Sequence, residues 1–361
     1  MARTHDIRQS ELRDFATELM VGLRRAGAPT HRLEAAMARF AAQTNLRAEF
    51  YALPTALVAC VGDNTRVVPT DAGPPRLDQL QDLTDLAERV GSARLTAAAG
   101  RVALREVLAG PPRYDFLTQA AGMAGMTGTA ALFLGGRWQE ALAAAVVGLL
   151  VAGWGPLTAR FQRLGSLFEL GVTTAGAVAV AVVGLAVGPL APELALLAGL
   201  IVVLPGFTLT TAMTELTTQH RIAGATGVMA AATSLLQMGV GVALGGRLVA
   251  GIQTTAMTGD MAHPIPEVLL LAAIASFFVV VLSARPRDLP LVFIACGAAV
   301  YGARWGAQIL GPELGLAAGA LIVTVVGNLA TRYLSVPLRP AMCPASSSSF
   351  PAVWAFEPYR P

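Results

Sequence analysis

A broken apolar segment that turns polar has the clearest chemical content in this chain. Residues 194–204 are apolar, and Pro205-Gly206 then interrupts them. Proline removes a backbone donor and glycine adopts dihedrals closed to other residues, so the pair predicts a break in a helix. Inside a bilayer the freed backbone groups need partners from protein or from a water-filled cavity. Broken helices with polar side chains build solute sites in many membrane proteins. The alternative is a proline kink that only shapes helix packing.

Hydroxyl side chains follow the break directly. Thr208, Thr210 and Thr211 could donate and accept hydrogen bonds to a small polar ligand. A helix that begins after Gly206 would also direct the positive end of its dipole toward a ligand carboxylate. These residues therefore predict a binding site for a small polar molecule.

Two carboxylates are candidates for carrying a proton across a membrane. Glu215 ends the fourth apolar segment, and Glu169 lies early in the third. Buried charge is costly in lipid and burial favours the protonated form of a carboxylic acid, so either could exchange a proton. The alternative for Glu169 is a side chain that reaches the polar membrane surface. We expect His220 and Arg221 at the cytoplasmic rim of the site, where a loop histidine is usually solvated.

The composition indicates an integral membrane protein. The 361 residues are 54% hydrophobic and 14% charged, with a mean hydropathy of +0.58, whereas soluble domains carry about 25% charged residues. The formal net charge of +3 is modest and requires no nucleic-acid partner. Three scattered cysteines show neither a disulfide framework nor metal-ligand spacing. We expect no metal and no cofactor.

Eight apolar segments could cross a bilayer, at roughly 20 residues per span. Arginines gather in every second loop, which predicts the cytoplasmic side. The charged N-terminus lacks an apolar signal segment and is expected in the cytoplasm too. A multi-pass protein of the cell membrane follows, whose small residues, as at Gly239, Gly241 and Gly245, allow close helix packing and a homo-oligomer. The expected spans are 115–134, 138–156, 167–188, 193–213, 223–245, 266–282, 289–304 and 311–330.

Residues 1–112 predict a small α+β domain on the cytoplasmic side. Apolar residues recur at helical spacing in four stretches, and Thr30 can cap the second helix. His31, Arg32 and Glu34 could form a site, but a solvated helix face is the more ordinary interpretation. The expected elements are helices at 11–26, 30–44, 77–90 and 93–108, and short strands within 48–60 and 65–69 around a turn at 62–64.

Two ordered blocks resemble the threonine/serine exporter family. The first is LRRAGAPTHRLEAAMARFAAQTNL with the strands and helix after it, in which Gly27, Arg32 and Glu34 stand at positions characteristic of the family. The second is LPGFTLTTAMTELTTQHRIAG, which is similar to the family's Pro-Gly motif and its polar run. The resemblance covers about residues 10–335. It implies a cytoplasmic domain followed by ten spans in two inverted five-span halves.

Two departures from the family pattern bear on function. The family often has an arginine where this chain has Gly227, so a partner for a substrate carboxylate is missing and the substrate stays open. After Arg339 the chain reads PAMCPASSSSFPAVWAFEPYRP, where a second Pro-Gly motif and two spans would stand. If GC-rich codons are assigned to this tail and read in another frame, they can give VPGLLLQFPG, which resembles the missing motif. We therefore hypothesise a frameshifted tail; the alternative is natural divergence. The expected divisions are 1–112, a transport domain at 113–335, and a non-membrane tail at 336–361.

The resemblance implies a secondary transporter that exports threonine and serine, driven by protons, and not an enzyme. One alternative is a dicarboxylate exporter of the same fold, with Arg221 as the nearby positive charge. Others are a membrane-anchored enzyme or regulatory module acting through residues 1–112, or an inactive remnant. The expected partners are threonine, serine, protons and the lipid bilayer. The candidate residues are Pro205, Gly206, Thr208, Thr210 and Thr211 for substrate, Glu215 and Glu169 for protons, and His220 and Arg221 at the rim.

Overall fold

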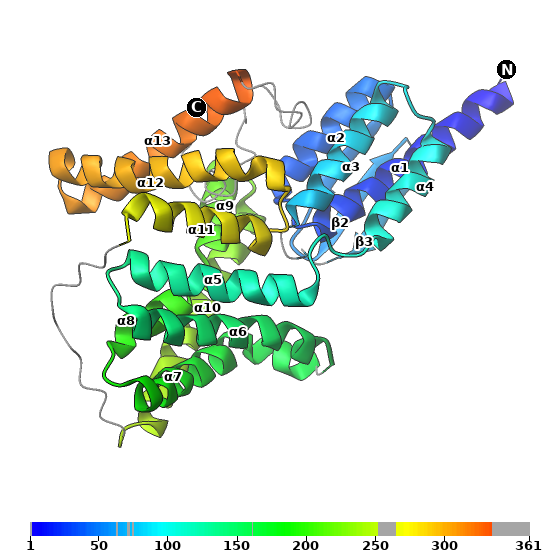
Figure 1. Ribbon diagram of the computed structural model, residues 1–361. Coiled ribbons are helices and arrows are strands. Elements are labelled where there is room, and N and C mark those ends of the chain that lie inside the picture. Colours follow the sequence, from blue (N-terminus) through cyan, green and yellow to red (C-terminus); the bar gives the residue numbers. More distant parts are fainter. Residues whose placement is uncertain are drawn as a thin grey trace.

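The computed structural model describes residues 2–62, 64–70, 73, 76–160, 162–251 and 265–333. Within them the chain is mainly helical, with thirteen α-helices and one three-stranded sheet near the N-terminus (Figure 1). The expected class, a helical membrane protein with a small α+β N-terminal part, is confirmed. The predicted tail at 336–361, and the frameshift hypothesis with it, lies outside the described residues.

The N-terminal part folds around one apolar core. Phe15 and Phe40 are fully buried there, with ring centroids 5.5 Å apart, and Leu19, Leu33 and Leu83 complete its centre. The antiparallel sheet has the order β1-β2-β3 and contacts α1 and α2. The elements are α1 (Ala2–Arg25), α2 (Thr30–Thr44), β1 (Ala48–Ala52), β2 (Ala56–Val61), β3 (Asn64–Pro69), α3 (Leu77–Gly91) and α4 (Ala97–Ala109).

Local backbone chemistry corrects two of the predicted boundaries here. The stretch 48–60 is two strands, because the chain turns at Pro54 and the Leu53 N–H donates to the Ala56 carbonyl at 2.8 Å. The fourth helix begins at Ala97 rather than at 93, because Ala93 has a φ of +57° and the Thr96 hydroxyl caps the helix.

The remaining helices lie beside one another with the N-terminal part at one end (Figure 1). Neighbouring pairs include α5 with α6, α6 with α7, α5 with α11, and α12 with α13. Their bounds are α5 (Phe116–Phe133), α6 (Trp138–Arg160), α7 (Phe168–Val187), α8 (Pro192–Gly199), α9 (Gly206–Thr217), α10 (Arg221–Leu248), α11 (Glu267–Val281), α12 (Leu289–Leu310) and α13 (Pro312–Tyr333), with 3-10 turns η1 (Gln162–Leu167) and η2 (Pro286–Asp288).

Four described helical segments are long and apolar enough to cross a membrane, judged by length and composition: Trp138–Leu157, Gly165–Val187, Arg221–Leu248 and Pro286–Leu310. Glu267–Val281 and Leu314–Gly327 are shorter apolar helices. The number is smaller than the eight spans expected. One reason is that α5 carries polar residues along its length, and another is that the expected span 193–213 is not one helix.

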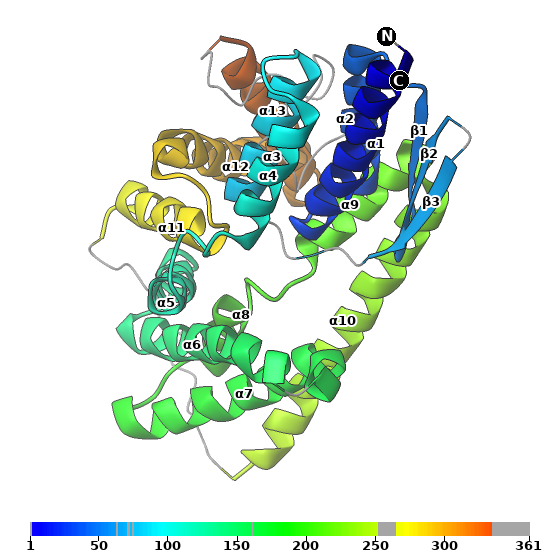
Figure 2. The same cartoon turned by 90° about the vertical axis from the view of Figure 1, so that its right-hand side faces the viewer.

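The Pro-Gly break separates α8 from α9, as the sequence predicts. The chain from 200 to 205 forms turns, and Pro205 stands at the N-cap of α9 with a ψ of 39°. On the near side, α8 packs against α5, α6 and α7, and a Cβ at Gly199 would meet Val147 at 2.7 Å. On the far side, α9 lies against the N-terminal part, and the long α10 leads away from it (Figure 2). The two halves of the predicted span therefore belong to different surroundings.

The first half of α10 packs closely against α9. A Cβ at Gly227 would lie 2.7 Å from the Ala212 Cβ, and one at Gly224 would lie 2.6 Å from Leu216. Gly239, further along α10, has no other atom within 4 Å of such a Cβ. The predicted small-residue face therefore does not include Gly239 as a close contact in this chain.

The second half of α10 packs against α7. A Cβ at Gly241 would lie 2.8 Å from the Thr173 Cβ, and one at Gly245 would lie 2.5 Å from the Ala177 Cβ. Because the higher number on one helix faces the higher number on the other, α7 and α10 run in the same direction. This arrangement agrees with the arginine pattern, which begins both spans on the same side of the membrane.

Candidate functional site

The threonines after the break are bonded mainly to their own helix. The Thr210 and Thr211 hydroxyls donate to carbonyls four residues earlier, at 2.8 and 2.9 Å. Their protons are therefore used, and their oxygens remain as acceptors. Among the described residues, none bonds the Thr208 hydroxyl, and no other atom lies within 4 Å of a Cβ built on Gly206. The first turn of α9 thus has an open side next to an unused hydroxyl.

Glu215 faces the N-terminal part of the molecule. The residue is only 7% exposed, and its Oε1 accepts a hydrogen bond from the Thr30 N–H at 2.9 Å. The sequence predicts that the Thr30 side chain caps α2, but this prediction is wrong: the Glu215 carboxylate, 185 residues away, accepts the hydrogen bond at this helix end instead. Phe207, near the other end of α9, packs against the core of the N-terminal part. Both ends of α9 are therefore docked on that part.

His220 extends the same contact. Its Nε2 lies 2.9 Å from Glu34 Oε2, and its Nδ1 lies 3.1 Å from the Thr218 hydroxyl. The other Glu34 oxygen accepts a hydrogen bond from the Ala52 N–H at 2.7 Å. Glu34 thus joins α2, β1 and the α9–α10 turn.

The prediction that His31 and Arg32 lie on a solvated face of α2 is wrong, because this part of α2 packs beside the α9–α10 turn. Arg32 is 8% exposed and His31 is half-buried, with its ring centroid 6.4 Å from that of His220. Burial lowers the pKa of His31 to about 4, and the neighbouring Arg32 and His220 add to this. No group of three His, Cys, Asp or Glu in the described part of the chain could hold a metal ion.

Arg221 lies away from the start of α9. Its guanidinium is exposed and donates to Gln219 Oε1 at 2.9 Å. It follows the C-terminal end of α9, and Gly206 begins that helix, so about 18 Å of helix separates them. Arg221 therefore brings no positive charge to the first turn of α9.

Glu169 lies in the helix bundle, in contact with α10. Its Oε1 accepts a hydrogen bond from the Ser234 hydroxyl at 2.8 Å, and both side chains are half-buried. Glu169 stands in the first turn of α7, so the alternative of a side chain that reaches the membrane surface stays open. Ser234 is a residue that sequence reasoning missed, because one serine in an apolar helix gives no signal of a partner 65 residues away.

The first turn of α9 and Glu169 share one face of α10. A Cβ at Gly227 would lie 4.0 Å from the Thr208 carbonyl, and Ser234 is seven residues further on. Seven residues are close to two turns, so Gly227 and Ser234 point the same way about 10 Å apart. The structure thus places the first turn of α9, at Thr208, and Glu169 along one strip on α10, and it places Glu215, His220 and Arg221 elsewhere.

The family model described as "Putative threonine/serine exporter" matches residues 14–249, which is more than half of the chain. The chain belongs to this family. The match begins within α1 and runs to the end of α10, and so it includes both blocks that carry the resemblance. Helices α11–α13 lie beyond it. No curated protein and no solved structure matched the chain.

Helix packing explains why this chain has glycine at position 227, where the exporter family often has arginine. Any side chain at this position would begin 2.7 Å from the Ala212 Cβ, closer than real Cβ atoms come. An arginine here would therefore push α9 away from α10. In this member of the family the position serves close packing of the two helices.

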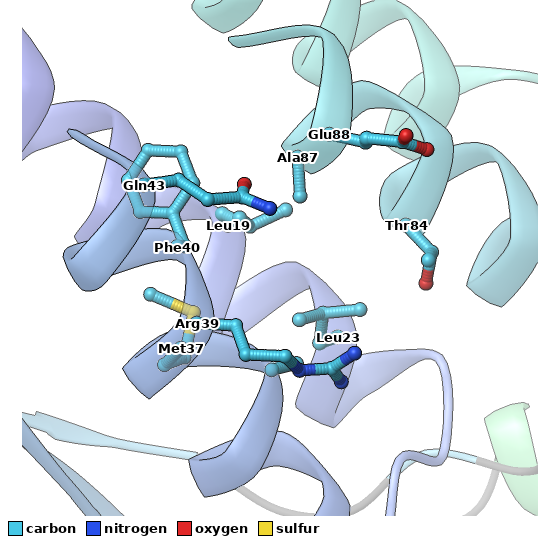
Figure 3. Close-up of a pocket in the computed structure, with 10 residues that line it drawn as sticks. Leu19, Leu23, Met37, Arg39, Phe40, Gln43, Thr84, Ala87 and Glu88 are labelled. Carbon is cyan, nitrogen blue, oxygen red and sulfur yellow. The ribbon is translucent and has the colours of Figure 1, made fainter. Parts of the chain in front are cut away.

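A shallow groove in the N-terminal part is separate from this strip. It lies among α1, α2 and α3, with polar side chains over an apolar floor (Figure 3). Its lining contains no serine, cysteine or histidine, and no hydrogen bond between its Thr84 and Glu88 side chains is present among the described residues. The lining residues are Leu19, Leu23, Ala36, Met37, Arg39, Phe40, Gln43, Thr84, Ala87 and Glu88.

Proposed function

We propose that this exporter-family member moves threonine and serine out of the cell in exchange for protons. The observation that carries the proposal is the strip on α10: the first turn of α9 lies beside Gly227, Glu169 bonds Ser234, and Gly227 and Ser234 are about 10 Å apart along the helix. An α-amino acid with one hydrogen bond at its ammonium and one at its carboxylate spans about 8 to 9 Å. A molecule of this class can therefore reach both groups.

The first turn of α9 is suited to the carboxylate end of the substrate. Pro205 and Gly206 start the helix without a side-chain cap, so its dipole and first N–H groups are not opposed by a protein carboxylate at that position. Thr208 has a hydroxyl to offer, and Thr210 and Thr211 have acceptor oxygens on the same short helix. These groups can bind a carboxylate and a substrate hydroxyl together.

Of the two carboxylates predicted to handle protons, we assign the exchange to Glu169. Glu169 lies on the strip, whereas the Glu215 oxygen is engaged with the Thr30 N–H at the end of α2. In this proposal Glu215 and His220 hold α9 against the N-terminal part. A change in that docking would move the substrate-binding turn, because α9 is a single rigid helix of twelve residues.

The proposal places residues 1–112 in the cytoplasm and the protein in the cell membrane. The parallel course of α7 and α10 supports it, since the arginine pattern starts both spans on the cytoplasmic side. The homo-oligomer stays a prediction, and two of the glycines it was based on, Gly241 and Gly245, pack against α7 within the chain. The divisions at 112 and 335 stay predictions as well.

An efflux assay tests the proposed function. Cells without exporters of their own are loaded with a threonine-containing dipeptide, and external threonine is followed with and without this chain, with serine and succinate in parallel. We expect faster threonine and serine efflux that a protonophore abolishes, and no effect on succinate. Succinate efflux without threonine efflux would replace the proposal with the dicarboxylate alternative.

A further inference from the structure

We propose that Glu169, Thr173, Ser234 and Gln237 form a subsite for the ammonium group of the substrate, at which ammonium and proton exclude one another. The inference rests on the proposed function and assigns the second end of the amino acid. It is carried by polar atoms between α7 and α10 that lack partners.

The first observation is an incompletely paired carboxylate. Glu169 Oε1 accepts one hydrogen bond from Ser234 at 2.8 Å, and it has no basic partner among the described side chains. A carboxylate has two oxygens and about four acceptor positions, so most of its capacity is unused. An ionised group in this position is stabilised when a cationic donor binds it.

The second observation is a buried hydroxyl without a partner. Thr173 is 0% exposed, and none of the described residues bonds its Oγ1. Its neighbour Thr174 is fully engaged, since that hydroxyl donates to the Leu170 carbonyl at 2.8 Å and lies 3.3 Å from the Gly241 carbonyl. An unsatisfied buried hydroxyl costs on the order of 1 to 3 kcal/mol. Such groups are usually completed by a ligand or water.

The third observation is an amide oxygen in the same state. Gln237 Oε1 is buried and has no partner among the described residues. Gln237 follows Ser234 by three residues and precedes Gly241 by four, so it lies on α10 between the two points that touch α7. Thr173 follows Glu169 by one turn on α7 and touches Gly241. The helices run parallel, so these residues fall within about 10 Å of one another along the interface.

The chemistry of the group selects the ligand. A carboxylate and an amide oxygen accept hydrogen bonds, and the Thr173 hydroxyl can accept one as well. An alkylammonium group has three N–H donors and no acceptor, so its donors match the acceptors that these residues offer. A carboxylate or phosphate ligand would face the charge of Glu169. The subsite therefore fits the cationic end of an amino acid.

Exchange with a proton follows from the single carboxylate. When the carboxyl group is protonated it is neutral, and it loses the charge that attracts ammonium. When ammonium binds, the proton leaves to water and the carboxylate forms, so charge and protons balance in each half of the cycle. Substrate and proton then occupy Glu169 in turn, which is the condition for antiport.

Among the described side chains, the other charged groups lie away from this carboxylate. The elements packed against α7 are α6, α8, α10 and η1, and the titratable side chain on α8 is the exposed Glu193 in its first turn. Titratable side chains on α10 stand only at its ends, Arg221 and Arg247, and the one on the described part of α6 is Glu140 at its far end. Glu140 is engaged with the Arg137 and Ala191 N–H groups at 2.8 Å each. The side chains of 158–164 are not among those described.

Ligand binding to the purified full chain in lipid nanodiscs tests the subsite. Labelled threonine and 3-hydroxybutyrate, which lacks the ammonium group, are titrated against wild type, Thr173→Val and Gln237→Met across pH 5–9. We expect at least a tenfold loss of threonine affinity in both variants and no change for 3-hydroxybutyrate. Wild-type affinity for threonine should fall as the pH is lowered, and Glu169→Gln should remove this dependence.

Stability and a neighbouring variant separate binding from structure. Thr173→Val should raise the melting temperature of the ligand-free protein, because it removes an unpaired buried hydroxyl. The control is Thr233→Val. The exposed Thr233 hydroxyl that it removes bonds the Met229 carbonyl at 2.8 Å, so this variant should bind threonine like wild type. Threonine affinity within twofold of wild type in Thr173→Val and Gln237→Met would overturn the subsite alone. A wild-type protein that binds no amino acid would overturn the proposed function as well.

Discussion

The polar groups between α9 and the N-terminal part are more completely paired than those along the strip on α10, although His31 Nδ1 on the first side is also buried without a partner among the described residues. Toward the N-terminal part, Glu215 bonds the Thr30 N–H, and Glu34 bonds both His220 and the Ala52 N–H. Along the strip on α10, the Thr208 hydroxyl of α9 and the Thr173 hydroxyl of α7 have no partner among the described residues. A hydrogen-bond network with all its groups paired holds two elements in one geometry. A network with unpaired groups is stabilised when a ligand pairs them. We therefore interpret the first side as an anchor and the second as a binding site.

The largest effect should come from removing the charge on the incomplete side. Glu169→Gln keeps a hydrogen-bond acceptor for Ser234 but loses the carboxylate, so we expect threonine efflux to fall at least about tenfold, the size of one charge-assisted hydrogen bond. Efflux per amount of protein in the membrane is the measurement. Wild-type efflux in Glu169→Gln, at equal protein, would refute the assignment of the proton site.

Close packing beside the strip should be the next most sensitive feature. Gly227→Ala places a methyl group 2.7 Å from the Ala212 Cβ and should cost about 1 to 3 kcal/mol by forcing α9 away from α10. The melting temperature and efflux should both fall. Gly239→Ala is the matched control, because its methyl group meets no atom within 4 Å and it should be neutral or slightly stabilising. Equal behaviour of the two variants would show that α9 does not lie against α10 in this way.

The anchor side should respond in structure more than in transport. Glu215→Gln keeps the acceptor for the Thr30 N–H but loses its charge at a helix N-terminus, which costs about 1 kcal/mol. We expect faster hydrogen exchange in the first turn of α2 and a smaller drop in efflux than in Glu169→Gln. An effect on efflux as large as that of Glu169→Gln would return the proton role to Glu215.

The smallest expected effect is a pH dependence of the stability of the folded protein, which arises at His31 on the anchor side. His31 has a pKa of about 4 when folded, against about 6.5 when unfolded, so between these values the unfolded chain binds the extra proton. The stability contributed by neutral His31 is present above pH 6.5 and is lost as the pH falls toward 4. We expect wild type to lose about 1 kcal/mol more than His31→Gln between pH 7.5 and 5.5 in thermal unfolding. Identical pH profiles would place His31 in solvent.

Sequence reasoning located the elements that depend on local chemistry. The interruption at Pro205-Gly206 and the helix from Thr30 to Thr44 follow from dihedral preferences and apolar spacing, and the structure confirms them. The partners of Glu215 and Glu169 could not be found in this way. They lie 185 and 65 residues away, and one serine or one backbone N–H leaves no periodic signal. The unpaired state of Thr173 is likewise visible only once the packing around it is known.

The central claim is that one carboxylate, Glu169, exchanges substrate for protons. Purified protein in liposomes that contain a pH-sensitive dye, with an outward threonine gradient and no pH gradient, tests it most directly. We predict that threonine efflux acidifies the lumen in wild type and in Glu215→Gln, and that Glu169→Gln abolishes the acidification. Threonine efflux from wild type without proton movement, or unchanged acidification with Glu169→Gln, would contradict the account.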